Sequence, residues 1–196
     1  MSEKIEMKGG TLLAPVPPAL VSCGTVEKPN ALAVAWTGIT CSDPPKTYVS
    51  IRPSRYSYGL IKESGEFVIN LPTEEMAKAI DFCGVHSGRD KDKLALCGLE
   101  VETSGKVIAP TVKNAKISLE CRVTDIIPLG SHDMFMADIL AVRIAPELLD
   151  ESGKIRFDKA KLIAYSHGEY YTLGKKIGGF GHSVRKKHRK PNSKTK

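Results

Sequence analysis

Long apolar runs are absent from this sequence, and no hydrophobic stretch approaches the roughly 20 residues that a membrane-spanning helix needs. The first residues contain no apolar core of the kind that marks a secretory signal peptide. No Rossmann glycine fingerprint follows a predicted strand, and no Walker A sequence occurs. We therefore expect a cytoplasmic protein that has no membrane segment and does not use the usual dinucleotide or triphosphate folds.

Paired cysteines are also lacking. The five cysteines are odd in number, and no C-x-x-C motif occurs. This argues against a disulfide framework and against a zinc knuckle, so we predict no metal site. Each thiol is expected to pack as a small buried hydrophobe. For Cys41, which follows Thr40, a redox role is the alternative interpretation.

The net charge of +7 comes from one end of the chain. Residues 185–196 hold seven of the 29 Lys and Arg residues and no Asp or Glu, which leaves 22 basic and 22 acidic residues in positions 1–184. The sequence therefore predicts a formally neutral domain over 1–184 and a basic, disordered tail over 185–196. Because the tail has no aromatic residue to stack on bases, we expect no specific nucleic-acid partner.

Short apolar and β-branched segments, which are typical of strands, fill much of the remaining sequence. Strands are expected at residues 31–37, 47–51, 66–71, 107–109, 113–127 and 134–144, and helices at residues 55–64, 74–83 and 89–96. Ser54 is the expected N-cap of the first helix, Gly65 should end it, and Gly84 should end the second. The last two strands flank a Pro-Leu-Gly turn and should form a hairpin. Gly38 is expected to break the chain after the first strand, and residues 165–184 are expected to be irregular. Many strands and few helices predict a mainly β, antiparallel barrel.

Two arginines and several hydroxyl groups follow the strand predicted at residues 47–51. They are Ser50, Arg52, Ser54, Arg55 and Ser57, and they lie where a helix should begin. Guanidinium groups and a helix N-terminus together favour a phosphate. An ordinary strand-to-helix junction with solvated arginines fits this segment equally well.

Two other strand ends carry residues suited to a flat ligand. Trp36, the only tryptophan, precedes Gly38, whose missing side chain lets a ligand approach the backbone. This segment fits either a wall for an aromatic ring or a tryptophan in the barrel core. Asn70 ends another predicted strand before Pro72, where its amide fits either the edge of a heterocycle or a plain strand end.

Two polar segments complete the candidates. Residues 83–93 combine a thiol, two glycines, a hydroxyl group, His86 and alternating charges, which fits either a ligand-closing loop or an ordinary loop. His132 precedes Asp133 at the start of a predicted strand. This pair fits either a proton-holding or substrate-contacting site or a surface turn.

Six segments carry a joint signal that none of them carries alone. They are PNALAVAWTG, SIRPSRYSYGLI, GEFVINLP, FCGVHSGRDKDKL, GSHDMFMADILAV and YYTLGKKIGGFGHSV. In this order they resemble the flavin reductase-like, FMN-binding split-barrel family, and its flavoredoxin branch in particular. The most specific parts are CG-x-x-SGRD-x-DK and LG-x-x-IGGFG-x-S, and the resemblance covers residues 10–184.

The resemblance implies a split β-barrel homodimer that binds one FMN per subunit near the interface. It implies an oxidoreductase that passes electrons to flavin, iron(III) complexes or a redox partner protein. The donor would be NADH, NADPH or a protein. A non-catalytic FMN electron carrier between proteins is the alternative. The flavin performs the electron chemistry, so the chain needs no strong acid or base of its own.

By position, the resemblance also implies the residues of the site. Ser50, Ile51, Arg52, Arg55 and Ser57 would hold the phosphate and ribityl chain, and Trp36, Thr37 and Gly38 would lie along the ring. The remaining implied contacts are Asn70, Leu71 and Pro72 at the ring edge, Cys83, Gly84, Ser87, Gly88 and Lys93 closing the pocket, and Tyr170 and Tyr171 covering it. His132 resembles a family histidine near the open flavin face and is the one predicted catalytic residue.

Overall fold

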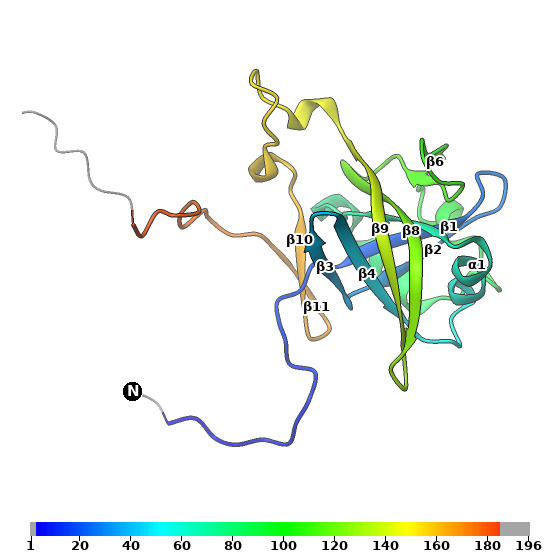
Figure 1. Ribbon diagram of the computed structural model, residues 1–196, viewed down its shortest axis with the longest axis horizontal. Coiled ribbons are helices and arrows are strands. Elements are labelled where there is room, and N and C mark those ends of the chain that lie inside the picture. Colours follow the sequence, from blue (N-terminus) through cyan, green and yellow to red (C-terminus); the bar gives the residue numbers. More distant parts are fainter. Residues whose placement is uncertain (1–2, 185–196) are drawn as a thin grey trace, which may run out of the picture.

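A seven-stranded antiparallel sheet dominates the molecule, with the strand order β2-β1-β5-β8-β9-β4-β3 (Figure 1). Its strands are β1 (Ala19–Gly24), β2 (Pro29–Val34), β3 (Thr37–Ser42), β4 (Pro45–Ile51), β5 (Glu66–Asn70), β8 (Ile117–Pro128) and β9 (Asp133–Ile144). The computed structural model describes residues 3–184. The predicted basic tail, residues 185–196, lies outside this range. The expected mainly β, antiparallel architecture is confirmed.

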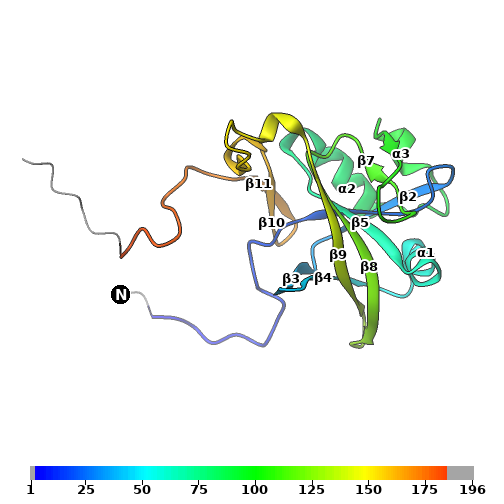
Figure 2. The ribbon, with the colours of Figure 1, turned by 45° about the horizontal axis from the view of Figure 1, so that its top comes forward.

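The remaining elements are short and lie around this sheet (Figure 2). The helices are α1 (Tyr56–Ser64), α2 (Ala77–Val85) and α3 (Lys93–Leu96), with 3-10 turns at Glu74–Met76, Pro146–Leu148 and Phe157–Lys159. Two small hairpins pair β6 (Val101–Glu102) with β7 (Thr111–Val112) and β10 (Ile163–Ser166) with β11 (Glu169–Thr172).

The two faces of β1 pack against different hydrophobic clusters. Successive side chains of a strand point to opposite faces of the sheet. Val21 and Cys23 therefore join Phe67 and Phe135 in one cluster, whereas Leu20 joins Ile80 of α2 in another. Both faces of β1 are buried, and α1 and α2 cover opposite sides of it. The site described below lies between these helices and the ends of β2 and β4.

Several predicted elements are confirmed with small shifts in their ends. The long strands β8 and β9 pair antiparallel across the predicted turn, from Ile117–Ile144 to Pro128–Asp133. Gly65 ends α1 with a left-handed φ of 68°, and its N–H donates to the carbonyl of Ile61. Glycine adopts this conformation without the steric cost that a Cβ atom brings.

Two predicted helix ends were wrong. Arg55 rather than Ser54 is the N-cap residue of α1, and no side chain caps this end. Gly84 does not end α2, because the helix continues to Val85. A Cβ at Gly84 would lie 3.3 Å from the Cβ of Ala33 on β2. The glycine therefore lets the helix pack closely on the strand instead of terminating it.

Three predictions about strands were also wrong. Gly38 does not break the chain but lies inside β3, where an added Cβ would lie 3.3 Å from the ring of Tyr48 on β4. Residues 107–109 form no strand, and Val107 and Ala109 are buried against Val68 in the segment between β6 and β7. Residues 165–184 are not wholly irregular, since the first of them belong to the β10–β11 hairpin.

Both described ends of the chain extend away from the sheet (Figure 1). They expose large apolar side chains, among them Leu12, Leu13, Leu173 and Ile177. Within residues 3–184, no helix has the length and apolar character that crossing a membrane would require.

Candidate functional site

Two adjoining clefts lie where the predicted arginine segment meets β2 and the end of α2. Their volumes are about 430 and 130 Å³, and both are lined by Leu32, Ala33, Arg52 and Arg55. We call them together the arginine cleft. Its other lining residues are Val34, Ala35, Trp36, Ser50, Ile51, Ser54, Tyr56, Ser57, Cys83, Gly84, His86, Ser87, Gly88, Lys93 and His132.

The charges that line the arginine cleft favour an anionic ligand. No Asp or Glu of the described chain lines it, whereas Arg52, Arg55 and Lys93 do. Neither guanidinium has a carboxylate partner among residues 3–184. The backbone between the two arginines is held in a turn, with the N–H of Arg55 donating to the carbonyl of Arg52 at 3.0 Å. Two unpaired arginines on one turn are suited to a phosphate group.

The pKa of His132 is affected by its position beside this arginine pair. Partial burial, followed by the charges of Arg52 and Arg55, lowers the pKa of His132 below its usual 6.5. The imidazole is therefore mainly neutral at pH 7. Its Nδ1 lies 2.9 Å from the hydroxyl oxygen of Ser131, and the neighbouring Asp133 accepts a hydrogen bond from Tyr58 at 2.7 Å. A neutral imidazole at this position suits hydrogen bonding to a ligand.

Lys93 is a buried cation at the inner end of the cleft. Its side chain is only 4% exposed, and its Nζ donates to the carbonyl of Cys83 at 3.1 Å. No carboxylate of the described residues pairs with it, and burial lowers its pKa. An ammonium group has three donors, and buried charges normally carry a partner. This one is therefore available to an anion that enters the cleft.

We expect Lys93→Met to stabilise the ligand-free protein by about 1 to 2 kcal/mol, because it removes a buried and unpaired charge. Below the folded-state pKa of Lys93, the folded and the unfolded protein both carry the proton, so the folded state bears the full free-energy cost of burying the charge. Between that pKa and 10.5 only the unfolded chain keeps the proton, so wild-type stability rises with pH. The advantage of methionine should therefore shrink as the pH approaches 10.5. Urea unfolding of both proteins across this range measures it, and a destabilised variant at pH 7 would contradict it.

Asn30 holds Ser57, one of the residues that line the cleft. Its Nδ2 donates to the hydroxyl oxygen of Ser57 at 2.6 Å, and the amide is 6% exposed. Gly88 lies directly against it, because a Cβ on Gly88 would be 1.9 Å from the Oδ1 of Asn30. The glycine loop of residues 87–91 therefore sits on the start of β2 and closes one side of the cleft.

Cys83 lines the cleft, but its thiol is not activated. Burial raises its pKa to about 11, although the charge of Lys93 acts in the opposite direction. Burial likewise raises the pKa of Cys23, and it raises that of Cys121 to about 12. Thiolates are the reactive form of cysteine, so these residues fit the predicted packing role.

Most of the predicted site residues are brought together by the structure, although they come from four separate segments. Trp36, Ser50, Ile51, Arg52, Arg55, Ser57, Cys83, Gly84, Ser87, Gly88, Lys93 and His132 all line the arginine cleft. Tyr170 lines a smaller neighbouring cleft, which shares Ala33, Arg55 and Gly84 with it.

The structure does not bring Asn70, Leu71 and Pro72 to the cleft. The Asn70 amide is fully buried, where it donates to Leu20 and Ser22 and accepts from Val112 and Ser118. Every polar atom of this side chain is therefore committed inside the core. Its predicted contact with a ring edge is not supported.

Three further predicted residues also lie away from the cleft. The hydroxyl of Thr37 donates to the carbonyl of Tyr48 at 2.6 Å, and Gly38 is covered by the Tyr48 ring. Tyr171 is half exposed, and its hydroxyl pairs with Glu169.

Sequence reasoning missed Asn30 and Tyr56 as residues of this region, and it named His86 in the candidate segment 83–93 without giving it a contact. Asn30 is the second residue of β2, and the one local signal for it is a polar residue next to an apolar run. His86 lines the cleft and stacks on Phe82, with ring centroids 4.0 Å apart. Nothing in the local sequence distinguishes this stacked histidine from one on a surface loop.

The chain is similar to a family of known proteins over most of its length. The family described as "Flavin reductase like domain" matches residues 12–174. The flavoredoxin structure of Desulfovibrio vulgaris (Miyazaki F) superposes with a TM-score of 0.86 at 30% identity, covering 93% of this chain and all of that one. Flavoredoxin from Methanosarcina acetivorans gives 0.83 at 28% identity, covering 94% of this chain and all of that one. An NADPH-flavin oxidoreductase of Streptomyces viridifaciens is 26% identical over 69% of this chain and 70% of its own.

These likenesses extend over most of the described chain. They cover the sheet, the arginine segment and the glycine loop, and the flavoredoxin chains are covered from end to end. The resemblance inferred from the six sequence segments is confirmed. The chain belongs to the flavin reductase-like family.

Proposed function

We propose that this protein binds FMN in the arginine cleft and passes electrons through it. The donor would be a reduced nicotinamide or a protein, and the acceptor would be flavin, iron(III) or a redox partner. The observation that carries the proposal is a cleft with two unpaired arginines and a buried ammonium but no lining carboxylate in the described chain. A protein named NADPH-flavin oxidoreductase and two named flavoredoxin among the similar chains support this class of reaction.

The donor set of the cleft fits FMN. Arg52, Arg55 and the hydroxyls of Ser54, Ser57 and Ser87 match a phosphate and a ribityl chain. The β2 side chains and Trp36 supply apolar surface for a ring. When bound, FMN supplies the hydride and electron chemistry. The chain then has to bind the cofactor, orient it and shield it from water. This task requires no acid or base with a strongly shifted pKa.

Within this proposal His132 orients the electron donor. It lines the part of the cleft that Trp36 and Ser50 also line, and partial burial together with the arginine charges lowers its pKa. We expect His132→Ala to retain FMN but to slow reduction by NADH or NADPH about tenfold, the effect of losing about 1.4 kcal/mol of contact. Stopped-flow absorbance of the bound flavin measures this. Unchanged reduction kinetics with both nicotinamides would remove His132 from the proposal.

The homodimer implied by the family resemblance is also part of the proposal. Leu12 and Leu13 near one end and Leu173 and Ile177 near the other are more than half exposed in the single chain. Exposed apolar side chains on extended segments are suited to packing on a second subunit. Light scattering of the purified protein should give twice the mass of one chain.

The experiment that tests the proposed function starts with the colour of the purified protein. A yellow protein whose flavin absorbance is bleached by NADH or NADPH supports an FMN-dependent oxidoreductase. A yellow protein that neither nicotinamide bleaches favours the alternative, a non-catalytic FMN carrier between proteins. A colourless protein that does not bind added FMN would refute both.

A further inference from the structure

Two free cysteines, Cys83 and Cys97, lie next to each other beside the arginine cleft. Cys83 belongs to α2, Cys97 is the C-cap residue of α3, and both helices pack against β2. The two side chains belong to one hydrophobic cluster, and their thiols are in hydrogen-bonding contact. Residues 84–96 separate them in the sequence, so the pair has no C-x-x-C spacing. None of the functions proposed above uses a thiol.

The two thiols differ in their access to solvent. Cys83 is 1% exposed, whereas Cys97 is partly exposed. A compound in solution therefore reaches Cys97 first. A reachable thiol with a buried neighbour suits a two-step exchange, in which the first thiol reacts with the external compound and the second displaces that compound.

Cys83 and Lys93 favour the thiolate form of Cys97. Burial raises the pKa of Cys97, whereas a hydrogen bond from the Cys83 thiol and the charge of Lys93 lower it. A neighbouring positive charge is a common way in which proteins make a cysteine reactive. Cys83 is not activated on its own, but it has to react only after Cys97 has done so. The second reaction is then intramolecular, which compensates for a weak nucleophile.

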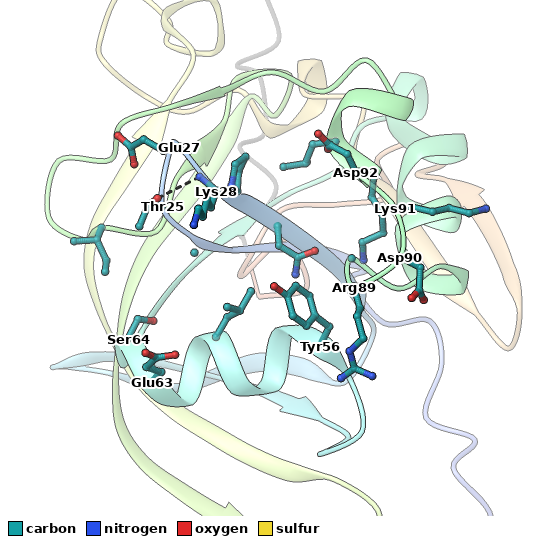
Figure 3. A pocket seen from close by; sticks show the side chains of 18 residues that line it. Thr25, Glu27, Lys28, Tyr56, Glu63, Ser64, Arg89, Asp90, Lys91 and Asp92 are labelled. Carbon is teal, nitrogen blue, oxygen red and sulfur yellow. Dashed lines mark hydrogen bonds between the residues drawn. The ribbon is translucent and has the colours of Figure 1, made fainter.

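A bond between the two sulfur atoms would close residues 84–96 into a covalent loop. Because the thiols are already in contact, we expect the bond to need only a small movement of the two side chains. The closed segment includes Lys93 and the glycine loop, on which Arg89 and Lys91 stand in Figure 3. Oxidation of the pair would therefore restrain the loop that closes one side of the arginine cleft.

We propose that Cys83 and Cys97 form a redox-active dithiol site whose substrate is a low-molecular-weight disulfide. The Cys97 thiolate attacks one sulfur atom of the substrate, which forms a mixed disulfide and releases one thiolate. Cys83 then loses its proton and attacks the sulfur atom of Cys97, which breaks the mixed disulfide, forms the Cys83–Cys97 bond and releases the second thiolate. The two cysteines lose two electrons and two protons, and the substrate gains them as two thiols. This site needs no flavin and does not rest on the proposed function.

The test uses oxidised glutathione as the probe and the full-length protein. We expect two of the five free thiols to disappear, and trypsin to release residues 79–89 joined to residues 94–106 after the remaining thiols are blocked. The bond closes a loop in the unfolded chain, so the thermal unfolding midpoint should rise by about 5 to 10 °C. Dithiothreitol should restore the five thiols and the original midpoint.

Cys97→Ser should abolish both the joined peptides and the shift in midpoint. Cys41→Ser is the matched control, because Cys41 is also partly exposed but lies on β3, at the other end of the strand order from β2. This control should form the bond as the wild type does. Three results would overturn the proposal: five thiols that persist in excess oxidised glutathione, glutathione that stays on Cys97 without displacement by Cys83, or a bond that lowers the midpoint.

Discussion

The double variant Arg52→Ala/Arg55→Ala should fold normally but purify without colour, with FMN affinity lowered by about two to four orders of magnitude. Each guanidinium is expected to make charge-assisted hydrogen bonds to the phosphate, and such bonds contribute about 1.5 to 3 kcal/mol apiece. Two of them amount to about 3 to 6 kcal/mol, which is the stated loss of affinity. Since both arginines are exposed, the lower half of this range applies at high salt.

Fluorescence titration with FMN measures this effect, because bound and free flavin differ in emission. The matched control is Lys154→Ala/Lys159→Ala, which also removes two exposed positive charges but lies outside the cleft. The control should keep its colour. The arginine variant should also raise the pKa of His132, since both guanidinium charges lower it, and NMR titration detects this without any ligand. Full yellow colour in the arginine variant would refute the assignment of the phosphate site.

Gly88→Ala should destabilise the protein by about 2 to 6 kcal/mol. The new Cβ would lie 1.9 Å from the Oδ1 of Asn30 and 2.8 Å from its Cγ, so the loop or the amide must move. Overpacking costs about 1 to 3 kcal/mol, and a buried amide that loses its partner Ser57 adds a similar amount. Because the loop closes the arginine cleft, FMN affinity should fall as well.

Gly59→Ala is the matched control for this substitution. Gly59 lies inside α1, is exposed, and has no atom within 4 Å of the position where a Cβ would be. Alanine there should stabilise the protein by about 0.5 to 1 kcal/mol, because glycine loses more conformational entropy in a helix. Urea unfolding of both variants measures the contrast. If Gly88→Ala proved as stable as the wild type, the loop would not be packed on Asn30.

The sequence predicted the parts of the fold that local patterns determine. The β8–β9 hairpin follows from two long β-branched segments around one turn, and the end of α1 follows from Gly65. It did not predict β1, because that strand is buried on both faces and shows no alternation. Gly38 was wrongly taken as a break, since the close approach of the Tyr48 ring that it allows depends on the neighbouring strand.

The same distinction applies to the site. Arg52, Arg55 and Ser57 are adjacent in sequence, so their joint presence in one cleft could be predicted. Contacts that join distant segments could not be derived from local pattern, and Asn30 against Gly88 is an example. A neighbouring groove of about 740 Å³ is another, because it needs the β1–β2 turn, α1 and the glycine loop in one place (Figure 3).

Asn70, which lies far from the cleft, has a consequence for folding. Its amide connects β5 to Leu20 and Ser22 of β1, to Val112 of β7 and to Ser118 of β8. A slip of one residue between these strands would turn every side chain to the opposite face and leave this amide buried without partners. Misaligned pairings of the central strands therefore carry a penalty that the native alignment avoids. Asn70 thereby selects one strand alignment for the sheet that holds the cleft.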